Sequence, residues 1–161
     1  MTLLLNDISD QTLRLLPKAA GAYILAIRLY RAVSLSQRQF AGKVVTPGTY
    51  LYCGSARGPG GIAARVKRHC AADKKQHWHV DALTTRPAGQ VTAALAVIGG
   101  DECQLRTILC DEFGLTAPIA GFGSSDCPTC PAHLLVVPGK GDVAEALLTG
   151  LSPLLCDGGC P

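Results

Sequence analysis

The chain has 161 residues, of which 48% are hydrophobic and 17% are charged, and a formal net charge of +3. This length suits one compact domain, and the composition excludes an intrinsically disordered protein. No uncharged run approaches the roughly 20 residues that a membrane-spanning helix needs, and no export signal is visible around Asp7 and Asp10. We therefore expect a soluble cytoplasmic protein with no membrane partner, whose eight cysteines are reduced thiols or metal ligands.

The first half of the chain predicts three antiparallel strands followed by a helix. Residues 21–30 are rich in aromatic and aliphatic side chains, and residues 32–38 alternate apolar with polar side chains. A Pro-Gly turn then starts a third strand at 49–54. After a glycine-rich loop at 58–61, apolar side chains at helical spacing predict a helix over 62–70.

The second half predicts, in order, a buried strand, a helix, a loop, a short strand and a short helix, at residues 90–98, 101–113, 117–132, 133–137 and 142–148. The helix has the clearest signal, because Asp101 is a good N-cap, Gln104 completes a capping-box pattern and Gly114 is a typical C-cap. Together these elements predict a single-domain α+β (mixed α/β) fold with a small central antiparallel sheet of three strands, flanked by helices.

Basic residues are concentrated between Arg57 and Lys75, a stretch that contains six of them and only one acid, Asp73. This stretch has a net charge of +5, which leaves −2 for the rest of the chain. A local basic cluster is typical of a face that binds the phosphates of a nucleic acid, although a solvated helix face has the same pattern. The candidate nucleic-acid-binding residues are Arg57, Lys67, Arg68, Lys74 and Lys75.

Two short motifs and a helix carry a resemblance to a known family. Gly21-Ala22-Tyr23 and Tyr52-Cys53-Gly54-Ser55 resemble the two halves of the GIY-YIG nuclease signature, and the next helix has Arg65 where that superfamily has its catalytic arginine. Further segments resemble a branch of small, largely uncharacterised proteins that also occur fused to some archaeal endonuclease III enzymes: HWHVD at 77–81, Glu102-Cys103, GFGSSDC at 121–127, Cys130 and His133-Leu134.

The resemblance implies a GIY-YIG-like domain at residues 20–137, after a lead-in segment at 1–19 and before a C-terminal extension with a short helix at 138–161. It also implies a metal-dependent endonuclease that hydrolyses phosphodiester bonds in DNA or RNA during DNA repair or processing. A partner protein would supply targeting, since no separate DNA-reading module is visible. The implied catalytic residues are Tyr23, Tyr52, Arg65 and His69.

Glu102 is the residue that would hold Mg2+ or Mn2+ in this enzyme, although it could also simply pair with Arg106. The sequence departs from the superfamily at this site, because the usual glutamate position falls near Thr107 and the asparagine of many relatives is absent. A catalytically inactive nucleic-acid-binding module therefore stays open as an alternative function.

A third interpretation starts from cysteine and histidine. Cys127, Cys130 and His133 form a C-x2-C-x2-H pattern that suits zinc, with Asp126 or a distant residue as the fourth ligand. A structural zinc ion there would indicate a zinc-stabilised interaction domain, whereas without zinc the segment would be a packed loop of reduced thiols.

The segment HWHVD holds several more polar and aromatic side chains. If it is extended, His77, His79 and Asp81 share one face and could bind a metal or the substrate backbone. Alternatively, hydrogen bonds between histidine and aspartate fix the segment against the core. Trp78 could stack on a base or lie buried.

Overall fold

The computed structural model describes residues 1–124 and 127–157, with side chains up to residue 155 in the last helix. Within these residues, no helix combines the length and the apolar character that crossing a membrane requires.

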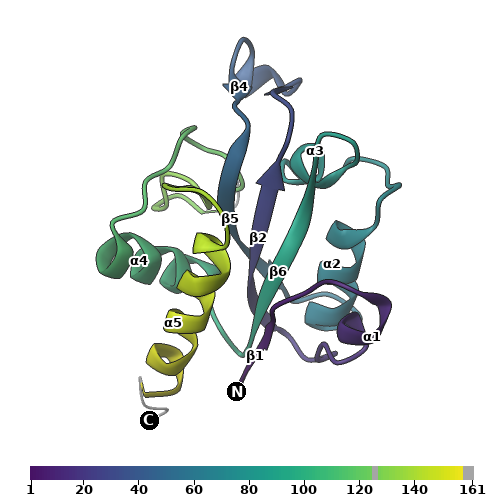
Figure 1. Ribbon diagram of the computed structural model, residues 1–161, viewed down its shortest axis with the longest axis vertical. Helices are drawn as coiled ribbons and strands as arrows, with labels where there is room; N and C mark the ends of the chain where they lie inside the picture. Colours follow the sequence, from purple (N-terminus) through teal and green to yellow (C-terminus); the bar gives the residue numbers. More distant parts are fainter. Residues whose placement is uncertain (125–126, 158–161) are drawn as a thin grey trace.

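A five-stranded antiparallel sheet forms the centre of the described structure (Figure 1), so the prediction of three strands was too low. The strands in spatial order are β1 (Thr2–Leu5), β6 (Gly89–Ile98), β2 (Gly21–Leu29), β5 (Gly48–Ala56) and β7 (Leu134–Val137). All neighbouring pairs are antiparallel. The α+β class is confirmed, and the strands predicted at 21–30, 49–54, 90–98 and 133–137 are present.

The prediction of a sheet strand at 32–38 was wrong. The only strand there is the short β3 (Val33–Ser34), which pairs with β4 (Val44–Val45) in a separate two-stranded sheet. The physical reason is that β5 and β6 already occupy both edges of β2, so the segment that follows β2 has no edge left to pair with. A 3-10 turn at Arg38–Phe40 completes this excursion.

The sheet separates two hydrophobic cores, because successive side chains of a strand point to opposite faces. In β2, Tyr23, Leu25 and Ile27 belong to one core, and Ala22, Ile24 and Ala26 belong to the other. A central strand buried on both faces is almost continuously apolar, which explains the sequence of residues 21–29. On the first face lie α1 (Asp10–Leu13), α2 (Gly61–Cys70) and α3 (Asp81–Thr84); on the other lie α4 (Glu102–Phe113) and α5 (Val143–Asp157) (Figure 1).

Both ends of the described chain take part in the sheet or its cover. β1 pairs with β6 along its whole length, so residues 2–5 form an edge strand. Helix α5 continues well beyond the expected end at residue 148 and through Pro153, because Leu148 and Leu151 are both buried in the second core.

The end of β5 positions the candidate site. β2 pairs with β5 as far as Ala56, whereas β7 pairs only with Thr49–Tyr52. Residues 54–56 therefore project beyond β7. β5 and β6 both run antiparallel to β2, so α2 and α4, which follow them, begin at this same end of the sheet on opposite faces.

Candidate functional site

A pocket at this end of β5 brings together six of the predicted catalytic and metal-binding residues, of which four belong to the predicted nuclease site and two, Cys127 and His133, to the predicted zinc site. Tyr23 and Tyr52 come from neighbouring strands, Arg65 from α2 and Glu102 from the first turn of α4. The remaining lining residues are Cys53, Gly54, Ser55, His77, Trp78, His79, Gly123, Cys127 and His133. Segments that lie far apart in the sequence thus form one small, mostly polar site.

Tyr23 lies against a glycine of the next strand. It pairs with Gly54 of β5, and a Cβ atom at Gly54 would lie 2.5 Å from the Tyr23 hydroxyl oxygen. The Tyr23 ring is therefore seated over backbone that must be glycine. Its hydroxyl is 2.9 Å from Nε2 of His69, which is itself 1% exposed.

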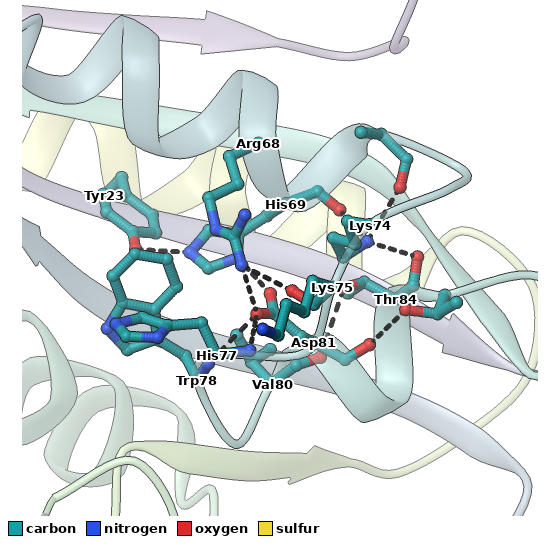
Figure 2. Close-up of polar contacts among 12 residues, drawn as sticks. Tyr23, Arg68, His69, Lys74, Lys75, His77, Trp78, Val80, Asp81 and Thr84 are labelled. Carbon is teal, nitrogen blue, oxygen red and sulfur yellow. Dashed lines mark hydrogen bonds and ion pairs between the residues drawn. The ribbon is translucent and has the colours of Figure 1, made fainter.

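His69 is held from its other side by Asp81, a fully buried carboxylate. Nδ1 of His69 lies 3.0 Å from Oδ1 of Asp81. Oδ2 of Asp81 accepts hydrogen bonds from the backbone N–H groups of His77 (2.9 Å) and Trp78 (3.0 Å) and from the Arg68 guanidinium (3.2 Å) (Figure 2). Asp81 thus has four donors, and it links α2 to the turn before α3.

The electrostatics of this network fix the direction of its hydrogen bonds. Burial lowers the pKa of His69, and it outweighs the opposing effect of Asp81. Burial also raises the pKa of the Asp81 carboxyl, but the hydrogen bonds from His69, Trp78 and His77 outweigh it and hold that pKa well below its usual range. A neutral His69 beside an ionised Asp81 donates Nδ1–H to the carboxylate, so its Nε2 accepts a hydrogen bond from the Tyr23 hydroxyl.

Trp78 supports the two arginines of α2 that lie near the pocket. Its ring centroid is 4.1 Å from Cζ of Arg65 and 4.9 Å from Cζ of Arg68, which is cation–π geometry. The indole is half-buried against the first core. Trp78 therefore packs beneath Arg65 and leaves the guanidinium of Arg65 in the pocket lining.

The HWHVD segment is not the extended strand that would align His77, His79 and Asp81 on one face. It is a tight turn wrapped around Asp81, because the carboxylate collects the backbone N–H groups of residues 77 and 78. His79 points elsewhere, and its Nδ1 accepts a hydrogen bond of 3.1 Å from the backbone N–H of Gly123. The interpretation in which histidine and aspartate fix this segment agrees with the geometry.

Tyr52 forms the pocket wall beside the loop that carries Gly123. Burial raises the pKa of Tyr52, and its exposed fraction is 6%. Gly123 has φ +72°, and a Cβ atom there would lie 2.7 Å from Cε2 of Tyr52. This glycine is therefore required both by its backbone conformation and by the close approach of the tyrosine.

Glu102 is the first residue of α4, directly after the N-cap Asp101, whose side chain accepts a hydrogen bond from the N–H of Gln104. Its Oε2 is buried and has no hydrogen-bond partner within residues 1–124 and 127–157. The nearest cation is Arg57, at 4.0 Å, so the pairing with Arg106 that the helix spacing allows is not the one that forms.

The candidate nucleic-acid-binding residues fall into two groups. Lys67, Lys75 and Arg57 are exposed, although Arg57 also lies 3.7 Å from Asp101. Arg68 is engaged by Asp81 and by the carbonyl of Lys75. The ammonium of Lys74 donates to three backbone carbonyls, those of His69, Ala71 and Thr84.

A cluster of thiols and imidazole borders the pocket. The ligand atoms of Cys103, Cys127, Cys130 and His133 all lie within 4.8 Å of one another, so the cluster could hold a metal ion. Hydrogen bonds from Thr129, Cys130 and Cys103 lower the pKa of the Cys127 thiol to about 6. Asp126, expected as a fourth ligand, lies outside the described residues, and Cys103 of α4 takes that place.

Sequence reasoning did not assign two of these residues to the site. Cys103 has no partner at short spacing, because it is 24 residues before Cys127, and its only signal was its position in a matched segment. Asp81 was noted in a polar segment, but its pairing with His69, 12 residues earlier, follows only from how α2 and α3 meet.

Comparisons with known proteins give one family. No curated protein and no solved structure matches the chain. A family model does match residues 22–154, which is most of the chain, and it includes every pocket residue named above. The chain therefore belongs to the family described as the domain of unknown function DUF123.

Proposed function

We propose that this protein is a metal-dependent endonuclease of the GIY-YIG kind that hydrolyses phosphodiester bonds in nucleic acid, with DNA as the main substrate, in repair or processing. The observation that carries this proposal is the meeting of Tyr23, Tyr52, Arg65 and Glu102 in one pocket. The resemblance to the superfamily assigns these four residues to one site, and they come from four different elements.

The hydrogen-bonded chain Tyr23–His69–Asp81 provides a path for the proton of the attacking water. A buried tyrosine with a raised pKa does not ionise by itself near neutral pH. Neutral His69 can take the Tyr23 hydroxyl proton at Nε2 while the Tyr23 oxygen takes a proton from water. The imidazolium that forms is stabilised by Asp81, which keeps its own negative charge throughout.

Arg65 is suited to the phosphate itself. A guanidinium binds two phosphoryl oxygens at once, and it stays charged through the reaction. The stacking of Arg65 on Trp78 limits its motion, so less ordering remains to be done when phosphate binds. The hydroxyl of Tyr52, which lines the same pocket, would orient the phosphate from the other side.

Glu102 would hold the divalent ion, Mg2+ or Mn2+. Its buried Oε2, which accepts no hydrogen bond in the described part of the chain, fits this role, since such ions bind through one or two carboxylates plus water and phosphate oxygens. When bound, the ion would neutralise charge on the phosphoryl oxygens and acidify water. The thiolate-rich cluster suits zinc instead, so the two metals would use different ligands.

The nucleic acid would approach α2 and the segment that follows it, where Lys67 and Lys75 are exposed. The concentration of positive charge between Arg57 and Lys75 in a chain of net charge +3 supports this direction. Arg68 and Lys74 contribute mainly to the fold, because their side chains are already bound to protein acceptors. A partner protein would supply the targeting.

One observation favours a second candidate, a nucleic-acid-binding module without catalysis. Glu102 lies 4.0 Å from Arg57, and this ion pair competes with metal binding. If the pair persists in solution, the pocket would bind phosphate through Arg65 and leave it intact.

The test compares purified wild type with Arg65→Ala on labelled single-stranded, duplex, flapped and branched DNA in Mg2+, Mn2+ or EDTA. Arg31→Ala is a matched control, because Arg31 is exposed and follows the far end of β2. We expect metal-dependent cleavage that Arg65→Ala slows roughly 100-fold to 1,000-fold and Arg31→Ala leaves unchanged. Binding without cleavage under every condition would favour the inactive module, and neither binding nor cleavage would refute both candidates.

A further inference from the structure

We propose that Cys103, Cys127, Cys130 and His133 bind one zinc ion as a closed structural site, and that this ion fastens the start of α4 to the loop that walls the pocket. Three of these residues are close together in the sequence, whereas Cys103 comes from a different element. The proposal concerns metal binding alone, so it does not depend on the nuclease activity proposed above.

The spacing of the ligand atoms suits tetrahedral zinc. With Zn–S near 2.3 Å and Zn–N near 2.0 Å, a tetrahedron has edges of about 3.8 Å between sulfurs and about 3.5 Å between sulfur and nitrogen. Sγ of Cys103 lies 3.4 Å from Sγ of Cys127 and 3.6 Å from Nε2 of His133. No pair of ligand atoms exceeds 4.8 Å. Small side-chain shifts would therefore bring all four atoms onto one ion.

The chemistry of the donors also selects zinc. Three thiols with one imidazole are a typical structural zinc set, and thiolates disfavour Mg2+ and Ca2+. Cys127 and Cys130 are the ends of a C-x2-C turn in which the backbone N–H of Cys130 points at Sγ of Cys127, at 3.3 Å. Such outer hydrogen bonds orient a ligating sulfur. Four protein ligands leave no position open, so the ion would be structural and not catalytic.

The surroundings of the cluster provide a counter-charge. Zinc with three thiolates carries one net negative charge. Arg106 follows Cys103 by three residues on α4, so the two side chains lie on the same side of the helix. The buried Nε of Arg106 has no hydrogen-bond partner in the described part of the chain. An anionic metal centre would therefore balance the charge of this half-buried arginine.

The ion would fix the pocket from two sides. Cys103 directly follows Glu102, and Cys127 and His133 themselves line the pocket. The same loop includes Gly123, which packs against Tyr52. Zinc would thus hold the Glu102 side and the Tyr52 side of the pocket at a constant separation.

The test uses the full chain, purified under reducing conditions, with Cys110→Ala as the control for Cys103→Ala. Both cysteines are half-buried in α4, but Cys110 is outside the cluster. We expect one zinc per chain by elemental analysis in wild type and in Cys110→Ala, and a tetrahedral thiolate spectrum on Co2+ substitution. In Cys103→Ala, zinc binding should weaken by more than the roughly 100-fold that loss of an outer-shell partner produces.

A second measurement needs only the wild type. In the zinc-bound protein, Cys103, Cys127 and Cys130 should resist alkylation, whereas the similarly half-buried Cys110 should react. Absence of zinc and of the Co2+ spectrum would overturn the proposal. So would a disulfide between Cys103 and Cys127, whose sulfurs now lie 3.4 Å apart, or alkylation of Cys103 at the rate of Cys110.

Discussion

Replacing Asp81 by asparagine tests the network that fixes His69. The change keeps the size of the side chain but removes the charge and one acceptor oxygen. Asp81 is 0% exposed and accepts from His69, Arg68 and two backbone N–H groups. If the asparagine oxygen keeps the three donors of Oδ2, its NH2 group must face Nδ1 of His69.

The expected loss of stability follows from these contacts. A hydrogen bond to a charged group contributes about 1.5–3 kcal/mol. In Asp81→Asn the bond with His69 is reversed and becomes neutral, and the other three donors keep only a neutral acceptor. Arg68 is partly exposed, so its share is small. We therefore expect Asp81→Asn to lower the free energy of unfolding by about 2–4 kcal/mol at pH 7, measured by urea denaturation. Asp73→Asn, an exposed change in the same segment, should leave it within about 0.5 kcal/mol.

The stability difference between wild type and Asp81→Asn should depend on pH. The pKa of Asp81 is depressed in the folded chain. Its contribution to stability is therefore present above the unfolded-state pKa of about 3.9, and it is lost as the pH falls from there through the folded-state pKa. The difference between wild type and Asp81→Asn should accordingly be largest near neutral pH and shrink below about pH 4.

The same substitution should also change the tautomer of His69. With an NH2 group facing Nδ1, that nitrogen becomes an acceptor and Nε2 carries the proton, so Tyr23 can no longer donate to it. Nitrogen NMR of the imidazole distinguishes the two tautomers. Wild-type stability together with an unchanged tautomer in Asp81→Asn would refute the electrostatic argument.

Two further substitutions test contacts around the pocket by urea denaturation. Gly54→Ala should destabilise the fold by about 1–3 kcal/mol, because its Cβ would lie 2.5 Å from the Tyr23 hydroxyl. Gly48→Ala should be nearly neutral, because its Cβ would lie 3.8 Å from the Tyr50 ring, and equal effects of the two changes would contradict the steric account. Lys74→Met should lower the free energy of unfolding by about 2–3 kcal/mol, since it removes the donor to three carbonyls. The exposed change Lys75→Met should alter it little. A loss of nucleic-acid affinity with no loss of stability would instead indicate that Lys74 binds phosphate.

Local patterns predicted well the elements that have a long apolar run or clear helix caps. The apolar run from Gly21 to Tyr30 and the capped helix that begins after Asp101 have strong local signals, and the structure contains both. The number of strands in the sheet was not predictable in this way. It depends on pairings such as that of Leu5 with Ala94, and residues so far apart leave no periodic signal in the sequence.

The candidate site shows the same division. Tyr23, Tyr52 and Arg65 were named from short motifs, and they do line one pocket. Asp81 and Cys103 act through partners 12 and 24 residues away, so only the packing of α2 against α3, and of α4 against the loop, reveals them. Lys74 was grouped with surface cations by charge alone, but the carbonyls that bind its ammonium come together only in the folded chain.

The order of strands in the sheet also has a consequence for how the chain folds. β1 lies beside β6, and the pocket draws on residues from Tyr23 to His133, so both form only when distant parts of the chain come together. Closing such long loops is entropically unfavourable before the contacts form, and chains of high contact order fold slowly. During synthesis, the basic helix α2 emerges well before α4 and the cysteine loop. The nascent chain therefore presents its cationic surface before the pocket beside it exists.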